Sequence, residues 1–346
     1  HFGSICDGPV NENLQMANVV DAILTMNPDI LCLQEVTQSN AYPTIAALVS
    51  ILGSDEWGGN IIASDPTDCS HNQGIIYKKS KVQFVNASLL NNGSPSQGNS
   101  YYHNWSNGRY PALYNVNLIV GTVFIPVSLV NIHAKAFSDE SSYIRRKGAS
   151  EGLKEILDGA QYNTKNIIVL GDFNDYINST TCSQCQTSDS PYKNFLDDSV
   201  NYMIPTQNIE NNGCVYYPYV IDNMIISNEM FDNYISNSVG QELIVLNTIS
   251  NYCTTTSDHI PVSSMFEFSA TSRTEDFYSE SPLKIYPNPA TDIINFDKEV
   301  SFAIFDITGK KVFSSKNVSS VNISRLNKGI YLVKTSEGTV SKLIKK

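Results

Sequence analysis

Short runs that are apolar at every position constrain the fold of this chain more than any other feature. Ile30–Leu33 and Ile167–Leu170 are two such runs. A strand with one face in water alternates apolar and polar residues, so a wholly apolar run is typical of a sheet covered on both faces. Helical periodicity is present in Asn11–Met26 and Tyr143–Leu157. These patterns predict an α/β fold in which helices cover buried sheets.

Further strands are predicted where apolar or alternating runs lie between turn-forming residues. Two long polar segments, Asn91–Asn107 and Gly171–Pro191, are predicted as loops. No apolar run approaches the roughly 18 residues needed to cross a bilayer, so membrane insertion is not predicted. The additional strands are expected at Gly74–Lys78, Phe84–Leu90, Asn115–Val120, Phe124–Ile132, Val220–Ile226 and Pro261–Phe268.

Charge divides the chain into two parts. Residues 1–270 carry 11 basic and 26 acidic side chains, whereas residues 271–346 carry 12 basic and 8 acidic ones. A Ser/Thr/Glu-rich segment, residues 269–282, is typical of a linker. We therefore expect a large acidic domain over residues 1–268 and a second domain over residues 283–346. An acidic domain makes little use of long-range attraction for polyanions, so cations would have to supply positive charge locally.

The second domain has short alternating strands separated by turns, which favours a small β-sandwich. Thr308-Gly309 is predicted as a hairpin turn. The strands are expected at Leu283–Tyr286, Ile293–Phe296, Ser301–Asp306, Lys311–Ser314 and Ile330–Lys334.

The chain has seven cysteines. Cys32 lies within an apolar run and is predicted to be a small buried hydrophobe. The others lie in polar segments, and we predict at least one disulfide formed in an oxidising compartment. Closing Cys182 or Cys185 onto Cys214 would stabilise the fold by about 3 kcal/mol. A zinc site built on Cys182 and Cys185 is the alternative.

Polar residues follow several of the apolar runs directly. Such groups meet at one edge of an α/β sheet, where the sites of these folds lie. Carboxylates with an amide and no neighbouring cysteine suit a hard cation such as Mg²⁺, Mn²⁺ or Ca²⁺. These ions bind phosphate oxygens and help to activate water. The candidate residues are Glu35, His133, Asp172, Asn174, Asp222, Asp258 and His259.

Five short motifs carry a resemblance to a known family. They are Leu33-Gln34-Glu35-Val36, Asn131-Ile132-His133-Ala134, Gly171-Asp172-Phe173-Asn174-Asp175, Ile221-Asp222 and Ser257-Asp258-His259. In this order they resemble the motif set of the endonuclease/exonuclease/phosphatase superfamily, over about residues 1–268. The resemblance implies a metal-dependent phosphoric ester hydrolase. It also implies a four-layer α/β/β/α sandwich of two mixed sheets, with the site at one end.

The resemblance implies a role for each matching residue. Glu35 would hold the divalent cation with Asp258 near it, and Asp172 would belong to the same centre. Asp172 and Asn174 would orient the attacking water and a phosphate oxygen. His259 would contact the scissile phosphate, with its orientation and charge set by Asp222.

Two further residues match the family's phosphate-handling groups. His133 would be the second histidine, either an acid for the leaving oxygen or a phosphate clamp. Arg109, in Gly108-Arg109-Tyr110-Pro111, resembles the family's phosphate-binding arginine, and a loop surface charge is the alternative.

Two departures from the family pattern affect the metal centre. The family begins with a strand that ends in a metal-binding asparagine, and His1-Phe2-Gly3 stands where that strand should already have ended. We therefore expect the first strand to be missing from residues 1–268. The carboxylate that often supports the second histidine is not evident near Asn72-Gln73.

The second domain has a resemblance of its own. Three ordered blocks resemble the C-terminal sorting domain of type IX secretion, which implies a secreted or cell-surface protein that contacts the secretion machinery. A plain adhesion-type β-sandwich is the alternative. The blocks are Leu283–Ala290, Phe305–Lys310 and Leu326–Lys334.

Three functions compete for the large domain. The first is a secreted nuclease that cleaves nucleic acid with metal-activated water, and it is our first choice. The second is a phosphatase or phosphodiesterase acting on small-molecule or lipid phosphoesters. The third is a binding module whose catalysis has lapsed. We expect a monomer.

Overall fold

A computed structural model describes residues 1–346 apart from 5, 40–42, 63–68, 70, 92–98, 216, 270–282, 307–308 and 337–339. The chain separates into two compact units, residues 1–270 and 271–346. The expected linker, residues 269–282, lies almost wholly outside the described residues, as does Thr308 of the expected hairpin turn. No helix among the described residues is long and apolar enough to span a membrane.

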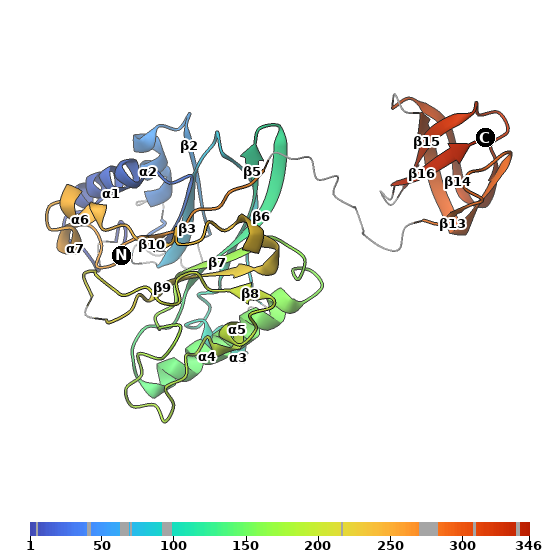
Figure 1. Ribbon diagram of the computed structural model, residues 1–346. Coiled ribbons are helices and arrows are strands. Elements are labelled where there is room, and N and C mark those ends of the chain that lie inside the picture. The colour runs from blue at the N-terminus through green and yellow to red at the C-terminus, as the bar shows by residue number, and fades with distance from the viewer. Residues whose placement is uncertain are drawn as a thin grey trace. The chain divides into compact units, whose positions relative to one another are not determined.

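The first unit contains a three-stranded antiparallel sheet whose outer face is covered by two helices (Figure 1). Its strands lie in the order β1, β3, β2, and the helices are α1 and α2. Asn11 caps α1 by accepting the Leu14 amide, which is an ordinary start for a helix. The bounds are Ile30–Val36 for β1, Asn72–Lys78 for β3, Trp57–Ile62 for β2, Glu12–Met26 for α1 and Thr44–Leu52 for α2.

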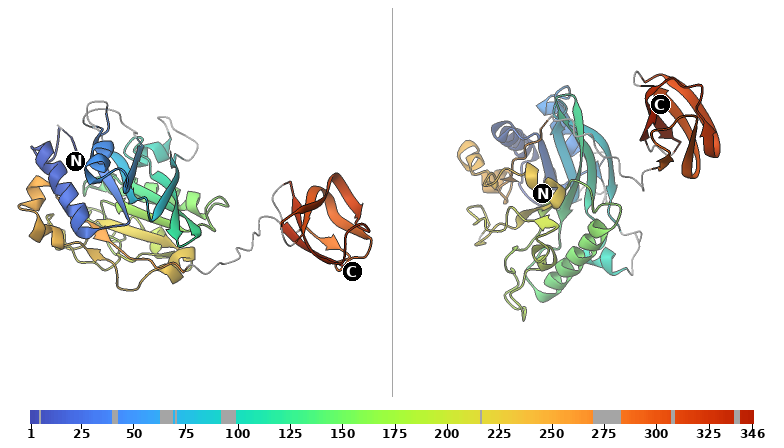
Figure 2. Two further views of the ribbon diagram at one scale, coloured as in Figure 1. Left: turned by 90° about the horizontal axis from the view of Figure 1, so that it is seen from above. Right: turned by 45° about the vertical axis from the view of Figure 1, so that its right-hand side comes forward.

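A second, six-stranded sheet lies in the order β4-β5-β6-β7-β9-β8, with β6 and β7 parallel and the other pairs antiparallel. Helices α3, α4 and α5 cover its outer face (Figures 1 and 2). The strands are β4 (Val82–Leu89), β5 (Ala112–Val120), β6 (Val123–His133), β7 (Ile167–Asp172), β8 (Tyr202–Met203) and β9 (Asp222–Ser227). The helices are α3 (Ser100–Asn104), α4 (Glu140–Asp158) and α5 (Lys193–Leu196).

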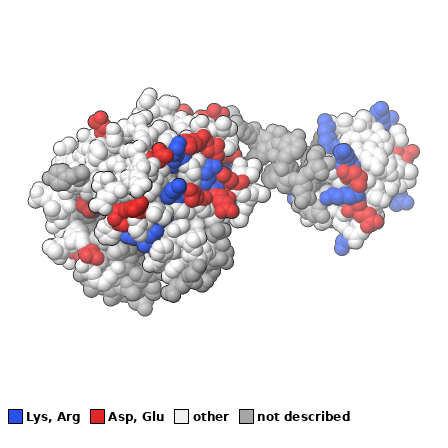
Figure 3. Space-filling view, turned by 90° about the horizontal axis from the view of Figure 1, so that it is seen from below, with Lys and Arg blue, Asp and Glu red and all other residues white. Residues whose placement is uncertain are grey.

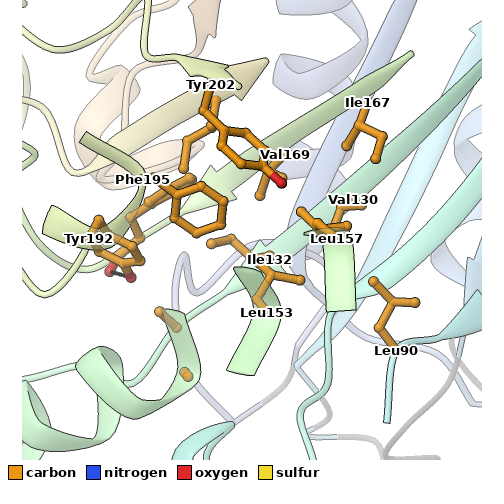
Figure 4. Packing of buried hydrophobic residues seen from close by; sticks show 14 of the residues in the cluster. Leu90, Val130, Ile132, Leu153, Leu157, Ile167, Val169, Tyr192, Phe195 and Tyr202 are labelled. Carbon is orange, nitrogen blue, oxygen red and sulfur yellow. Dashed lines mark hydrogen bonds between the residues drawn. The ribbon is translucent and has the colours of Figure 1, made fainter. Parts of the chain in front are cut away.

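Alternating side chains of the strands enter different cores. On β6, Leu129 packs between the two sheets, whereas Val130 and Ile132 pack under α4. On β7, Ile168 faces the other sheet and Val169 faces the helices (Figure 4). Both faces of these strands are therefore buried, which explains the uniform apolarity of Ile167–Leu170 on β7. The predicted α/β/β/α sandwich is confirmed.

Short elements complete the first unit. They are η1 (Asn228–Asn233), β10 (Gly240–Gln241), α6 (Ile244–Thr248), α7 (Tyr252–Thr255) and β11 (Val262–Ser263). The strand expected at Pro261–Phe268 is reduced to β11 and a single bridge between Phe266 and Tyr234. The loop expected at Asn91–Asn107 contains α3, because Tyr101 and Trp105 form a buried i,i+4 pair within a polar segment.

The disulfides differ from the expected bridge. Cys182 bonds to Cys185, Cys214 bonds to Cys253, and Cys6 bonds to Cys69. The prediction of at least one disulfide is confirmed. The bridge from Cys182 or Cys185 to Cys214, considered above as one possibility, is not formed, and the Cys182–Cys185 bond excludes the zinc alternative for this pair. Spacing along a sequence does not determine connectivity among several cysteines. Cys32 is free and buried as predicted.

The second unit is a curled antiparallel sheet around its own apolar core, consistent with the predicted small β-sandwich. One strand, β13, replaces two predicted ones, because the polar run Asp297-Lys298-Glu299 forms an exposed irregularity in register rather than a turn. The edge strand β16 was not predicted. The strands are β12 (Ile285–Tyr286), β13 (Ile293–Asp306), β14 (Lys311–Asn322), β15 (Gly329–Thr335) and β16 (Val340–Lys345).

Candidate active site

Three neighbouring strands of the larger sheet present polar residues in one register row. His133 at the end of β6 is the direct partner of Asp172 at the end of β7, and Asp172 is the partner of Asp222 at the start of β9. We call His133, Asp172 and Asp222 the strand row. Backbone pairing alone brings these residues together, although they are far apart in sequence.

His259 joins the strand row through a side-chain contact. Its Nδ1 lies 2.7 Å from Oδ2 of Asp222, and its backbone N–H donates to Oγ of Ser257. The negative charge of Asp222 raises the pKa of His259 well above its usual 6.5, although burial acts against this. This histidine is therefore a cation at neutral pH.

Asp172 lies at the centre of the row and is nearly buried. Its Oδ1 accepts the backbone N–H of Asn174 at 2.8 Å, and its Oδ2 accepts the Asn174 amide at 2.7 Å. Asn174 adopts a left-handed backbone conformation with φ of 52°. Burial, with added repulsion from Asp222 and Glu35, raises the pKa of Asp172 to about 7, although His259 opposes the rise.

The turn before Asn174 requires a glycine. Gly171 has φ of 129°, and a Cβ there would collide with the carbonyl oxygen of Ile132 on the neighbouring strand. The motif that contains Gly171 and the motif that contains Ile132 are thus in close backbone contact.

Glu35 reaches the same place from the other sheet. It sits at an irregularity of β1 with φ of 54°, and its Oε1 lies 3.5 Å from Nε2 of His133. The same imidazole nitrogen lies 3.6 Å from Oδ2 of Asp172. Two carboxylates from different sheets therefore converge on one imidazole.

Asn131 locks the two sheets together beside this meeting point. Its side-chain amide donates to the carbonyls of Leu33 on β1 and Gly74 on β3, at 3.0 and 3.2 Å. Its Oδ1 accepts the Gln34 amide at 2.6 Å. Asn131 thus fixes the distance between Glu35 and the strand row.

His133 is almost completely buried, with 2% of its surface exposed. Burial, together with the nearby Arg109 charge, lowers its pKa well below 6.5, so the ring is neutral at neutral pH. Its Nδ1 is buried without a hydrogen-bond partner among the described residues.

Arg109 is held against the row by backbone carbonyls. Its Nε donates to His133 O at 3.0 Å, and its Nη2 donates to Ala134 O at 2.8 Å. Burial lowers its pKa to about 10, so it remains charged at neutral pH. The surface-charge alternative does not describe this guanidinium, which lines the same cavity as Glu35 and His133.

Asp258 is placed differently from the other candidates. It is an exposed residue, whereas the other candidates are buried or half-buried. Its charge contributes to the raised pKa of its neighbour His259.

The cavity has a volume of about 420 Å³ and includes residues that sequence reasoning missed. His1 and His71 offer ligand atoms that lie, with a Glu35 oxygen, within 4.8 Å of one another. The backbone places His1 here, because Phe2 pairs in parallel with Val36 on β1. Lys135, Phe137 and Arg145 also line the cavity. None of these five follows an apolar run, so the pattern used to find the others did not reach them.

The donor set fits a divalent cation. Glu35 raises the pKa of Asp172 by repulsion, and a cation between two such carboxylates would relieve this. Carboxylate oxygens with imidazole nitrogens are also a ligand combination that divalent metals accept.

The fold and this arrangement define a phosphoester hydrolase, and comparison with known proteins agrees. Residues 6–260 match the Endonuclease/Exonuclease/phosphatase family, so the chain belongs to that family and is a hydrolase of its class. Enzymes of this family generally use divalent metals. A search of curated proteins finds no match.

Solved structures share the fold at low identity. An AP endonuclease from Archaeoglobus fulgidus is 14% identical with a TM-score of 0.53, covering 78% of this chain and 97% of its own. The 3′ phosphatase NExo from Neisseria, bound to a product DNA hairpin, is 14% identical with a TM-score of 0.51, covering 75% and 97%.

The second unit matches a different family from the first. Residues 284–346 match the Secretion system C-terminal sorting domain. The protein is therefore directed by type IX secretion to the cell surface or the extracellular space.

Proposed function

We propose that the first unit is an extracellular nuclease that hydrolyses phosphodiesters of nucleic acid. The observation that carries this proposal is the convergence of the carboxylates Glu35 and Asp172 on His133, with the Arg109 guanidinium bonded to the His133 carbonyl. The cationic His259 pairs with Asp222, which is the strand partner of Asp172. Two fixed positive groups facing two carboxylates suit a phosphate that is attacked by water.

The chain's own residues would divide the reaction between them. When bound, a divalent cation polarises the phosphate and lowers the pKa of a coordinated water. Glu35 and Asp172 would hold that cation, and Asp258 stays a predicted ligand near it. Asp172 and Asn174 would orient the attacking water, in line with the leaving oxygen.

The cationic groups would act on the phosphate itself. His259, kept protonated by Asp222, would stabilise charge that develops on the non-bridging oxygens, and Arg109 would bind them. His133 is neutral and buried, so it suits a hydrogen-bonding phosphate clamp better than a general acid.

The proposal extends to which divalent cation binds at this site. The sequence favours Mg²⁺, with Mn²⁺ or Ca²⁺ as alternatives. Imidazole ligands such as those of His1 and His71 suit transition metals, whereas Mg²⁺ and Ca²⁺ prefer oxygen. We therefore propose that Mn²⁺ binds more tightly than Mg²⁺ at Glu35.

Two observations favour a nucleic-acid substrate. Lys135 and Arg145 bring further positive charge to the cavity beside an exposed aromatic ring, that of Phe137. The two structures described above are an AP endonuclease and a 3′ phosphatase bound to a product DNA hairpin.

A small-molecule phosphoester is the second candidate. The first unit is acidic overall, and Figure 3 shows acidic and basic side chains intermixed on one of its faces. Such a surface gives little attraction for a long polyanion. A cavity of about 420 Å³ would hold a compact phosphoester.

A substrate panel tests the proposal. Plasmid DNA, RNA, a mononucleotide, an inositol phosphate and sphingomyelin would each be incubated with Mg²⁺, Mn²⁺ and Ca²⁺, with Asp172→Asn as the inactive control. We expect strand scission that EDTA abolishes. Release of free phosphate without scission, or cleavage of sphingomyelin, would favour the second candidate.

We also propose the domain limits of residues 1–268, 269–282 and 283–346, with the last segment acting only as the address. A chain that ends at residue 282 should hydrolyse the same substrate but remain inside the cell envelope. Unchanged export of the shortened chain would contradict this role.

A further inference from the structure

Phe137 is held in a conformation that a bulky side chain rarely adopts. Its φ is 78°, and 73% of its surface is exposed. A bulky residue at positive φ is strained and persists only where its surroundings enforce it. Burial of the ring does not explain this conformation.

A buried arginine enforces it. Nη1 of Arg146, on α4, donates to the carbonyl oxygens of Lys135 at 2.8 Å and Phe137 at 2.7 Å. The same guanidinium forms an ion pair with Asp175, at 2.9 Å from Nε and 2.7 Å from Nη2, and both side chains are fully buried. We call Lys135–Phe137 the Phe137 loop. Asp175 lies one residue after Asn174, so this loop is tied to the turn that carries Asp172.

The ring has a cation on one side. Nζ of Lys135 lies 4.3 Å from its centroid, within the range of a cation–π interaction. Arg145 stands nearby at the cavity, anchored by bonds from Nε and Nη2 to the carbonyl of His103. The loop thus presents an exposed aromatic surface and two positive charges in the cavity that contains Glu35 and His133.

These features together fit one chemical class of ligand. A nucleobase stacks on an aromatic ring, and the phosphate of the next nucleotide pairs with Lys or Arg. A single exposed ring is too small to be a protein- or membrane-binding patch.

We infer that Phe137, Lys135 and Arg145 form a nucleotide subsite, in which Phe137 stacks on the base beside the scissile phosphodiester and the two cations bind the adjoining phosphate. This inference rests on the proposed nuclease function and specifies its substrate contacts. The subsite reads the presence of a base and not its identity, because every base has an aromatic face.

Cleavage of two matched single strands tests the stacking role. One is a short thymidine oligonucleotide, and the other has the same length but carries only tetrahydrofuran abasic residues. Phe137→Ala should lower kcat/KM by about tenfold or more on the thymidine strand and leave cleavage of the abasic strand unchanged. Phe137→Trp should restore cleavage of the thymidine strand.

Two controls accompany it. Phe124→Ala removes another exposed phenylalanine, at the opposite end of β6 from His133, and should change neither rate. Lys135→Gln should weaken cleavage of both strands, because it removes a phosphate contact. It should also make the slope of log kcat/KM against log salt concentration shallower by about one. If Phe137→Ala lowers cleavage of both strands equally, or lowers neither, the subsite is overturned. Strand scission by the wild-type protein would still support the nuclease proposal.

Failure of the nuclease proposal gives a different result. If the wild-type protein cleaves neither strand nor any nucleic acid, the subsite is tested by equilibrium binding of AMP and ribose 5-phosphate in EDTA. A preference for AMP that Phe137→Ala abolishes would support it. Equal binding of the two compounds would overturn it.

Discussion

The two sides of the cavity are built in different ways. The strand row is positioned by backbone pairing across β6, β7 and β9. The Phe137 loop depends on one buried side chain, Arg146, for its conformation. Backbone pairing keeps the strand row in place when one of its side chains is replaced. A loop held by one ion pair loses its conformation when that pair is removed. In the proposed function, the reacting groups thus lie on the sheet and the nucleotide contacts on a loop.

The largest expected effect is on turnover when a side chain that contacts the strand row is removed. His259→Ala and Glu35→Ala should each lower kcat by about 10²- to 10³-fold, or roughly 3–4 kcal/mol of barrier, and leave the fold intact. Steady-state kinetics and circular dichroism measure both. Asp29→Asn, at an exposed carboxylate, is the control. Wild-type turnover in both variants would refute the site.

Asp172 should show a second effect, on stability. Its folded pKa of about 7 lies above its ordinary value of 3.8, so stability is lost as pH rises between these values. In EDTA, Asp172→Asn should therefore unfold at a higher temperature than wild type at pH 8 and at a similar temperature near pH 4, although it is inactive. A difference that is the same at both pH values would contradict the buried charge.

Breaking the support of the Phe137 loop should destabilise the unit. Arg146→Met leaves Asp175 buried without its partner, and the expected loss is about 3–5 kcal/mol in urea unfolding. Adding Asp175→Asn should recover part of this loss. Lys193→Met removes an exposed pair with Asp197 and should change little. If Arg146→Met and Lys193→Met change the free energy of unfolding equally, Arg146 is not what holds the loop.

A smaller change is expected in the pH profile. Asp222→Asn removes the charge that raises the pKa of His259. Protonated His259 would then be lost at a lower pH, so the alkaline limb of the kcat/KM profile should move toward acid. The variant should lose more activity at pH 8 than at pH 5.5. A profile that falls uniformly would mean that Asp222 only positions the ring.

The smallest effect concerns the metal. His71→Ala should weaken Mn²⁺ binding by about tenfold while Mg²⁺ binding stays near its wild-type value, because only the imidazole is removed. Titration calorimetry measures both ions without substrate. His103→Ala, at an exposed histidine outside the cavity, should alter neither. Equal loss of both ions would argue against an imidazole ligand.

The sheets and the strand row could be predicted because their signals are local. Asp172 follows an uninterrupted apolar run. Because such a run forms a buried strand, the residue after it must lie at the edge of the sheet. The directions of side chains in loops are not encoded in this way. Asp258 and His259 are neighbours in one motif, yet His259 contacts Asp222 while Asp258 is exposed. The cysteine partners are likewise decided by how distant loops pack.

Asn131 gives the molecule a property that neither sheet has alone. Glu35 belongs to the three-stranded sheet and Asp172 to the six-stranded one, and this amide spans the seam between them. Under the proposed mechanism, hydrolysis needs both halves to have docked. A nuclease built in this way would carry the right residues in transit to the outside and, with its halves still apart, remain harmless to the nucleic acids of the cell that makes it.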